Sequence, residues 1–367
     1  MRIGIDGRTF SDPAARGVRR YASRLIAALA DGFPEDELSV LVRGRAIGSG
    51  PELPARPNVA GYRRRLRRLP HAAAGLAGFP RIDRTLPEHP DVVWMPTIAP
   101  LATSRGVPLV LTVQDLSWER RTEDFTRYEV LFHRIARPRR LARSARRVVC
   151  LSKVVADEAT NRWGLDPDRV RVVPPGVDAQ SPTEAEIAAA RKRHRLASRY
   201  ILFVGALEPR KAPDVLVAAY ERARAEGLDA QLALAGAGRL ASKLGGDGVR
   251  LLGRVPDTDL APLYAGATAL AAPSWLEGFG LTPLEAAACG TAAVVSNLPA
   301  FAETLGDAAL RVPPGDVDAL AAALTRIARE CGLRDRLRAS ARAAAEPYTW
   351  ERAARATRAV LAEAAGQ

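Results

Sequence analysis

The chain has 367 residues, which exceeds one ordinary hydrophobic core and fits two domains of about 150–180 residues each. Hydrophobic residues make up 47% of the sequence and charged residues 26%, so a disordered protein is excluded. The net charge is +13, and arginine supplies almost all of the positive charge, because the only lysines are Lys153, Lys192, Lys211 and Lys243.

The sequence shows no sign of membrane insertion or secretion. We find no apolar run long enough to span a bilayer, and Asp6 and Arg8 stand where a signal peptide needs an apolar stretch. The three cysteines, Cys150, Cys289 and Cys331, are scattered and lack metal-ligand spacing, which indicates reduced thiols. We therefore expect a cytoplasmic protein.

Short apolar runs alternate with longer amphipathic stretches, a pattern typical of parallel sheets with crossover helices. In the first half, the pattern predicts helices over 18–30 and 125–145. The strands expected there cover 2–6, 38–42, 91–95, 108–113, 147–151 and 170–173.

The alternation restarts after a proline- and glycine-containing stretch at 174–183, which predicts a domain boundary and a second doubly wound domain. A helix is expected over 184–195, and a last helix begins near Trp350. The strands expected in this half cover 200–204, 231–235, 249–252, 268–272, 292–296 and 310–312.

Arginines gather in two clusters in the first half of the chain. A solvated helical face is the default interpretation. The functional alternative is attraction to an anionic membrane surface on the inner side of the membrane, worth about 1 kcal/mol for each basic residue. Nucleic acid ranks last, because no aromatic residues interleave with the arginines to stack on bases. The clusters are Arg63, Arg64, Arg65, Arg67 and Arg68, then Arg137, Arg139, Arg140, Arg143, Arg146 and Arg147.

Arg210 and Lys211 follow the strand expected at 200–204. Two adjacent cations at the carboxyl end of a strand suit a diphosphate, because arginine offers a bidentate fork and lysine a compact charge. The alternative is a pair that caps the helix beginning at 212–214. The scarcity of lysine in this chain favours the functional interpretation.

Two Asp-x-Asp triplets, at 257–259 and 316–318, invite comparison with metal-binding motifs. Both stand immediately before helical stretches, where aspartate is expected as a cap. We interpret them as caps. No cluster of His, Cys or carboxylate residues suggests another metal site, so neither a metal nor a cofactor is expected.

The stretch 273–290 places Glu277 and Glu285 eight positions apart, on either side of a glycine-rich turn. Thr282 suits an N-cap, Pro283 suits the first helical position, and Glu285 stands where a capping-box acid would lie. Gly278 and Gly280 leave backbone N–H groups bare for an anion or a sugar hydroxyl. The alternatives are that Glu285 only caps the helix, that Glu277 is a solvated loop acid and that the glycines serve only the turn.

This stretch resembles the E-x7-E signature of retaining glycosyltransferases with the GT-B fold, and most closely glycosyltransferase family 4. Other matches follow in the order that the family shows, so the resemblance covers nearly the whole chain. They are Ile3-Gly4-Ile5-Asp6-Gly7-Arg8, Gly17-Val18-Arg19-Arg20-Tyr21, Val173-Pro174-Pro175-Gly176-Val177-Asp178, Val204-Gly205-Ala206-Leu207-Glu208-Pro209-Arg210-Lys211 and Gly253-Arg254-Val255-Pro256.

The resemblance implies an α/β protein with two Rossmann-like domains that face a central cleft. The N-terminal domain, 1–178, would take the acceptor, and the domain at 179–346 would bind a nucleotide-sugar donor. The helix at 347–367 would cross back to the first domain.

The resemblance also implies roles for particular residues. Arg210 and Lys211 would bind the donor diphosphate and stabilise it as it leaves, and Glu277 would hold hydroxyls of the transferred sugar. Glu285 would bind the ribose. Backbone groups would make the remaining contacts: Gly17 with the phosphates, Val255 with the base, and Gly278, Phe279, Gly280 and Leu281 with sugar and phosphate.

One position departs from the family pattern. The family commonly has His-Asp-Leu after the strand expected at 108–113, whereas this chain has Gln114-Asp115-Leu116. Glutamine still donates and accepts hydrogen bonds but does not titrate. Our hypothesis is that Gln114 contacts the sugar as a neutral ligand.

The function expected from the resemblance is retaining, metal-independent transfer of a hexose from GDP-mannose or a UDP-sugar to a hydroxyl acceptor. The sequence does not identify that acceptor. Three alternatives stay open: a weak or inactive sugar-nucleotide-binding partner protein, a GT-B phosphorylase or epimerase, and a basic adaptor for membranes or nucleic acid.

Overall fold

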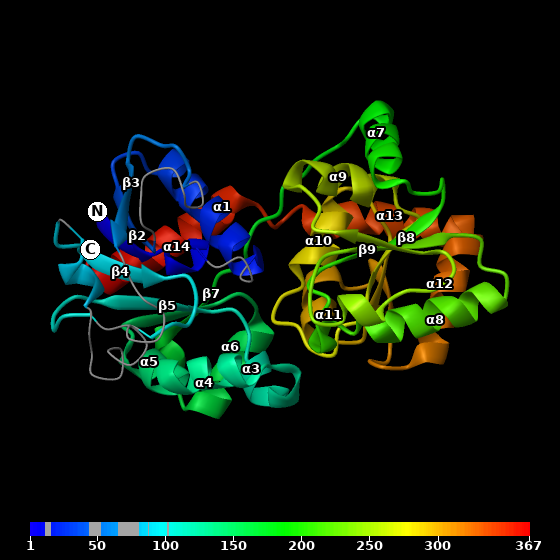
Figure 1. Cartoon of the computed structure of the whole chain (residues 1–367). Helices are drawn as coiled ribbons and strands as arrows, with labels where there is room; N and C mark the ends of the chain where they lie inside the picture. The colour runs from blue at the N-terminus through cyan, green and yellow to red at the C-terminus, as the bar shows by residue number, and fades with distance from the viewer. Residues whose placement is uncertain (12–15, 44–52, 65–80, 87, 101–102) are drawn as a thin grey trace. The chain divides into compact units, whose positions relative to one another are not determined.

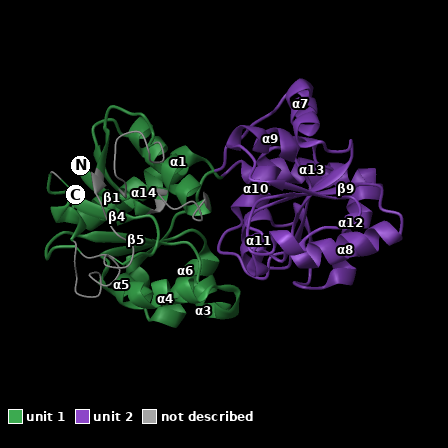
Figure 2. Ribbon diagram, in the orientation of Figure 1, with its two compact units in different colours: residues 1–176, 348–367 green, residues 177–347 purple. Residues whose placement is uncertain are grey.

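The computed structural model describes residues 1–11, 16–43, 53–64, 81–86, 88–100 and 103–367. The chain forms two compact units (Figure 2). The first contains Met1–Gly176 and Tyr348–Gln367, and the second contains Val177–Pro347. Of the predicted arginine clusters, Arg65, Arg67 and Arg68 lie outside the described residues.

Unit 1 is built on a seven-stranded parallel sheet with the strand order β3-β2-β1-β4-β5-β6-β7. Strand β1 pairs with β2 on one side and with β4 on the other, so the order reverses between β1 and β4. The strands are β1 (Arg2–Asp6), β2 (Glu37–Arg43), β3 (Val59–Arg64), β4 (Val92–Met95), β5 (Leu109–Val113), β6 (Arg147–Cys150) and β7 (Val170–Val172).

Helices cover both faces of this sheet (Figure 1). Alternate residues of the central strands, such as Leu111 and Val148, pack in one core with Leu141, Ala159 and Trp163 from the crossover helices. On the other face, α1 and α14 pack against each other. The helices are α1 (Arg16–Gly32), α3 (Ser117–Arg120), α4 (Arg127–Ala136), α5 (Pro138–Ser144), α6 (Lys153–Trp163) and α14 (Trp350–Ala365), with 3-10 turns at η1 (Arg8–Ser11), η2 (Ile82–Arg84), η3 (Thr122–Asp124) and η4 (Pro167–Arg169).

Ion pairs fix the C-terminal helix α14 to unit 1. Glu363 accepts hydrogen bonds of 2.7 Å from Arg147 of β6 and from Arg171 of β7. Arg358 donates to the buried carboxylate of Asp36, the residue before β2, at 2.7 Å. The last 20 residues therefore belong to the same folded body as the first 176.

Unit 2 repeats the architecture with a six-stranded parallel sheet in the order β10-β9-β8-β11-β12-β13. Its core joins Leu216 and Tyr220 of α8 and Leu324 of α12 to strand residues such as Ile201 and Val294. The strands are β8 (Tyr200–Val204), β9 (Gln231–Ala235), β10 (Val249–Gly253), β11 (Ala269–Ala272), β12 (Ala293–Ser296) and β13 (Ala309–Val312). The helices are α7 (Glu184–His194), α8 (Pro213–Ala225), α9 (Asp257–Gly266), α10 (Leu281–Ala288), α11 (Pro299–Leu305), α12 (Val317–Arg329) and α13 (Cys331–Ala345), with 3-10 turns at η5 (Pro209–Lys211) and η6 (Ala241–Lys243).

The two doubly wound sheets confirm the predicted fold class, with two corrections to the elements. Strand β3 was not predicted, since Val59-Ala60-Gly61-Tyr62 offers only a weak apolar alternation. The prediction of a single helix over 125–145 is wrong. It is broken into α4 and α5 at Arg137, which adopts a left-handed conformation with φ 46°. Pro138 causes the break, because it lacks an N–H and disfavours helical geometry in the residue before it.

Candidate active site

The strand order of unit 2 reverses between β8 and β11, the point at which open α/β sheets bind ligands. The loop after β8 leads to η5, which contains Arg210 and Lys211. The loop after β11 contains Glu277 and leads to α10. The predicted cations and the predicted carboxylate therefore follow neighbouring strands, β8 and β11, on either side of this reversal.

Lys211 and Glu277 form an ion pair that joins the two loops. The Lys211 ammonium group donates a hydrogen bond to Glu277 Oε1, and the side chains are 21% and 13% exposed. The buried Ser274 hydroxyl donates to the same oxygen at 2.7 Å. Glu277 is therefore not a solvated loop acid, and Lys211 does not cap α8, whose N-cap is Ala212.

Arg210 lies beside this pair and is held by its backbone. Its carbonyl oxygen accepts a hydrogen bond of 3.0 Å from the N–H of Trp275. Its half-buried guanidinium group has no partner among the residues that the structure describes. Lys211 is paired with Glu277, whereas the positive charge of Arg210 is available to an anionic ligand.

Backbone strain follows directly after these cations. Ala212 is fully buried and has a φ of 51°, a left-handed conformation that L-residues with a Cβ rarely adopt. Strained backbone persists where the surrounding structure fixes it, and it is concentrated at functional sites. Here it lets the chain turn from Lys211 into α8 within one residue.

The backbones of the loops after β8 and β9 lie in close contact at two glycines, Gly236 and Gly238. A Cβ atom on Gly236 would lie 1.8 Å from the carbonyl oxygen of Gly205, and one on Gly238 would lie 2.4 Å from that of Leu207. Only glycine permits this close approach to the loop that leads to Arg210 and Lys211. These glycines were not predicted, although the pattern Gly236-Ala237-Gly238 directly after a strand indicates a close backbone approach.

The predicted capping of α10 is wrong. The helix begins at Leu281, and its N-cap is Gly280, which has a φ of 93° and no side-chain cap. Thr282 and Pro283 therefore lie inside the first turn. Gly280, in its left-handed conformation, ends the preceding loop two residues before the N-cap that the Thr-Pro pattern predicted. A larger residue would not fit there, because a Cβ at Gly280 would lie 2.7 Å from the Phe301 ring. The first-turn N–H groups of α10 are consequently not used by a capping side chain.

Glu285 makes a tertiary contact instead of closing a capping box. Its Oε2 atom accepts a hydrogen bond of 3.0 Å from the hydroxyl group of Tyr264 in α9. Tyr264 is buried, and α9 starts directly after the loop that holds the predicted base-binding residue Val255, itself buried. Tyr264 was missed because its contact with Glu285 spans 21 positions, for which the sequence gives no signal. Ser274 lies only three positions before Glu277, so that contact was predictable.

The remaining predicted residues lie at the corresponding edge of the sheet in unit 1. Gln114 follows β5, and its side-chain amide donates a hydrogen bond of 3.1 Å to the carbonyl oxygen of Pro96, just after β4. Gly17 lies in the first turn of α1, and no atom would stand within 4 Å of a Cβ there. Gly17 follows β1 and Gln114 follows β5, and β4 lies between these two strands in the sheet.

The two Asp-x-Asp triplets differ in what their carboxylates bind. Asp316 is the N-cap of α12 and accepts a bond of 2.9 Å from the N–H of Ala319, as predicted. Asp259 is not a cap; it is buried and bound by Arg193 and His194 of α7. Burial alone raises the pKa of Asp259, but the hydrogen bonds from these residues outweigh it and hold the pKa below its ordinary value. Within the described ranges, no three His, Cys, Asp or Glu residues are grouped to bind a metal ion.

Two family descriptions match the sequence. Residues 15–181 match Glycosyltransferase Family 4, and residues 198–330 match Glycosyl transferases group 1. Among curated relatives, a D-inositol 3-phosphate glycosyltransferase of Actinosynnema mirum is 36% identical over 307 residues, covering 75% of this chain and 73% of that protein. The O-antigen chain mannosyltransferase B of Escherichia coli is 36% identical over 46% of this chain and 47% of its own length. The chain spans about half the length of several other relatives that it matches.

Solved structures share the whole fold. Sucrose-phosphate synthase of Thermosynechococcus elongatus superposes with a TM-score of 0.76 at 19% identity, covering 99% of this chain and 98% of that one. Anabaena HepE, solved in complex with UDP-glucose, has a TM-score of 0.73 at 17% identity and covers 99% of this chain and 100% of its own. At these identities the likeness shows the fold alone.

Proposed function

Because this chain belongs to glycosyltransferase family 4 and shares the GT-B fold, we propose that it transfers a hexose, with retention of configuration, from a nucleotide-diphosphate sugar to a hydroxyl acceptor. The single observation that carries the proposal is the Lys211–Glu277 pair across the strand reversal of unit 2. This ion pair supports the proposal, because a cation suited to phosphate and a carboxylate suited to sugar hydroxyls lie side by side.

Arg210 and Lys211 would bind the diphosphate and stabilise the negative charge that grows on it as the glycosidic bond breaks. A preorganised cation acts most strongly where charge develops in the transition state. Lys211 is held in place by Glu277, which is in turn held by Ser274, so little reorganisation is needed when the donor binds. The N–H groups at the start of α10 and the helix dipole would add to this stabilisation.

Glu277 would hold hydroxyls of the transferred sugar. Each of its lone pairs that is not used by Lys211 or Ser274 is available to accept from a hydroxyl. We place the acceptor attack on the same face as the departing phosphate, which then takes the acceptor proton. The protein's task in this mechanism is to position the reactants and stabilise the diphosphate.

Glu285 would accept hydrogen bonds from the ribose hydroxyls, with its carboxylate oriented by Tyr264. Val255 would meet the base through its backbone. These assignments leave the base unspecified, and both GDP-mannose and a UDP-sugar fit them. The mannosyltransferase name of one relative supports the first, and the UDP-glucose complex of HepE supports the second.

The acceptor is a hydroxyl compound, either a glycan, a lipid-linked glycan or a small molecule. D-inositol 3-phosphate is the first compound to test, since several relatives are named for it. We further propose that the reaction takes place at the inner face of a membrane, although no helix in the described ranges is long and apolar enough to cross one.

The test is mass spectrometry of reactions that contain UDP-, GDP- or ADP-hexoses, with and without acceptor and with EDTA. We expect one donor to lose its hexose to the acceptor in the presence of EDTA, and NMR of the product to show the donor's anomeric configuration. No turnover of any donor, or an inverted product, would contradict the proposal.

A second candidate function is a donor-binding protein with weak or no turnover, and Gln114 in place of the family histidine favours it. This protein would bind a nucleotide sugar but release no nucleoside diphosphate. A phosphorylase would instead need inorganic phosphate, and an epimerase would change the donor without an acceptor.

A further inference from the structure

Helix α4 of unit 1 exposes large apolar side chains to solvent. Tyr128 is 49% exposed and Leu131 48%, and they are two of four large hydrophobic residues exposed in the described part of the chain. They lie three positions apart, so they occupy the same side of the helix. Neither side chain contributes to a core cluster.

Arginines border this apolar strip. At about 100° per residue, Arg127, Leu131 and Arg134 project within about 60° of one another. The one acid of the helix, Glu129, projects to the opposite side and is engaged in a capping box, accepting from the Thr126 N–H at 2.7 Å. The exposed side of α4 therefore presents cations and hydrophobic groups without a carboxylate.

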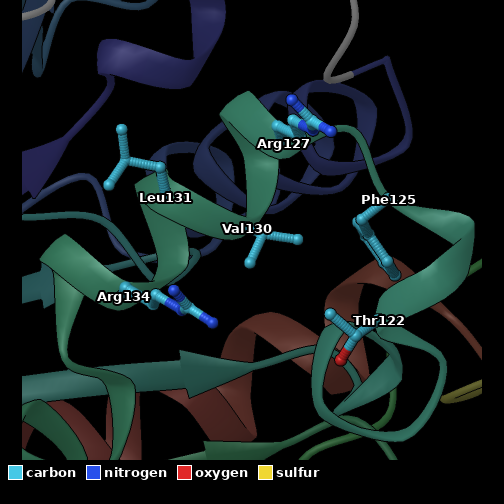
Figure 3. A pocket seen from close by; sticks show the side chains of 6 residues that line it. All are labelled: Thr122, Phe125, Arg127, Val130, Leu131 and Arg134. Atoms are coloured by element: carbon cyan, nitrogen blue, oxygen red, sulfur yellow. The ribbon is translucent and has the colours of Figure 1, made fainter.

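A shallow pocket of about 360 Å³ continues this surface toward η3. In Figure 3, Val130 and Arg134 of α4 face Phe125 and Thr122 across the hollow, and Arg127 lies at its rim. Three apolar side chains, two arginines and Thr122 line it, and no acidic residue does. A phosphate group beside an apolar chain is the ligand chemistry that such a hollow accommodates.

Positive charge extends beyond α4. Residues 127–147 contain eight arginines and one acidic residue. Arg139 and Arg147 pair with Glu119 and Glu363. Arg127, Arg134, Arg137 and Arg140 are exposed and have no ion-pair partner among the described residues. An unpaired cationic surface around exposed hydrophobic groups is complementary to an anionic bilayer.

We propose that α4 docks the protein on an anionic phospholipid bilayer. Tyr128 and Leu131 enter the interface between headgroups and acyl chains, while Arg127 and Arg134 bind lipid phosphates. Tyrosine suits this position because its ring is apolar and its hydroxyl stays wet. This surface is built from residues of unit 1 alone, and docking requires no bound nucleotide.

The test measures co-sedimentation of the full chain with vesicles of phosphatidylcholine alone and of phosphatidylcholine with 30% phosphatidylglycerol, without any donor. We expect binding to the anionic vesicles only. Arg127→Gln/Arg134→Gln should weaken it on the order of tenfold or more. Tyr128→Ser/Leu131→Ser should remove the part of the binding that survives high salt, since salt screens charge but not apolar insertion.

The matched control is Arg336→Gln/Arg355→Gln, which removes the same charge from exposed positions on α13 and α14. It should bind vesicles like the wild type. Equal weakening by this control would show a non-specific effect of net charge and overturn the proposal, as would wild-type binding by either α4 variant. Circular dichroism melting confirms that each variant is folded. Because the assay contains no sugar donor, its result stands apart from the proposed transferase activity.

Discussion

The hydroxyl group of Tyr264 lies 3.0 Å from Glu285 Oε2 and joins helix α9 to helix α10. Tyr264 is buried, and its backbone carbonyl is fixed in turn by a bond of 2.7 Å from the Thr291 hydroxyl. The carboxylate at the proposed ribose position is therefore oriented before a ligand arrives.

Tyr264→Phe removes only this hydroxyl. If Glu285 binds the ribose, KM for the donor should rise about tenfold with little change in kcat, since a hydrogen bond to a charged group is lost. A donor with a 2′,3′-dideoxyribose serves as the control, because wild type and variant should then bind it alike. An equal loss with both donors would indicate a merely structural role.

Lys211→Ala removes the cation that would stabilise the leaving diphosphate. We expect turnover to fall on the order of 10²-fold or more, comparable to the loss of one preorganised charge contact. Initial-rate kinetics measure the effect. Lys243→Ala is the matched control, because Lys243 is exposed at the end of η6. Near-normal turnover of Lys211→Ala would remove this residue from the mechanism.

Variants of Gln114 test whether a neutral side chain at this position, directly after β5, is sufficient for sugar transfer. Gln114→Ala should lower kcat/KM about tenfold, the equivalent of one hydrogen bond to the sugar. Gln114→His should retain activity, and its pH profile should show whether a titrating group changes turnover. If the alanine variant is as active as the wild type, Gln114 does not contact the sugar.

The ion pairs of Glu363 with Arg147 and Arg171 should make the free energy of unfolding depend on pH. The hydrogen bond from Arg147, supported by one from Arg171, lowers the pKa of Glu363 to about 2. A lowered pKa in the folded state adds stability above the unfolded pKa, and this stability is lost as the pH falls toward the folded pKa. Glu363→Gln should therefore unfold at lower urea than the wild type at pH 7, and the gap should narrow between about pH 5 and pH 3.

The control for this variant is Glu351→Gln, at an exposed position in the first turn of the same helix. It should keep a constant, small difference from the wild type over the same pH range. A gap for Glu363→Gln that does not change with pH would show that the ion pairs with Arg147 and Arg171 contribute nothing.

Gly176 is the last residue of the first segment of unit 1, and it lies against Trp350 in the second segment of that unit. A Cβ there would stand 2.2 Å from the backbone nitrogen of Trp350. Gly176→Ala should thus destabilise the protein by about 1–3 kcal/mol, because backbone must shift to admit the methyl group. Gly32→Ala, where no atom lies within 4 Å of the Cβ, is the control for thermal unfolding and should be neutral or stabilising.

Much of this architecture follows from local sequence patterns. Buried parallel strands such as 200–204 and 231–235 are continuous apolar runs between polar loops, so they were predicted nearly to the residue. Strand β3 lies at the edge of its sheet and contains Gly61 and two arginines, so its pattern was too weak to be recognised. The break at Arg137 was readable from Pro138 but was outweighed by the helical periodicity on both sides.

The candidate site was predictable where its residues lie close in sequence or follow a strand. Lys211 and Glu277 are 66 positions apart, yet each follows a strand that borders the reversal of the sheet. Tyr264 and Asp259 could not be assigned in this way. Their partners depend on how α9 packs against α10 and α7, which is fixed by tertiary structure and not by spacing.

Calorimetric titration of UDP, GDP and ADP into the wild type, Lys211→Ala, Glu285→Ala and the control Lys243→Ala tests the donor site most directly. We predict that at least one nucleoside diphosphate binds the wild type and the control equally, and that both site variants bind it at least tenfold more weakly. Binding of none of the three nucleotides to the wild type, or unchanged affinity in both site variants, would contradict a donor site built on Lys211 and Glu285.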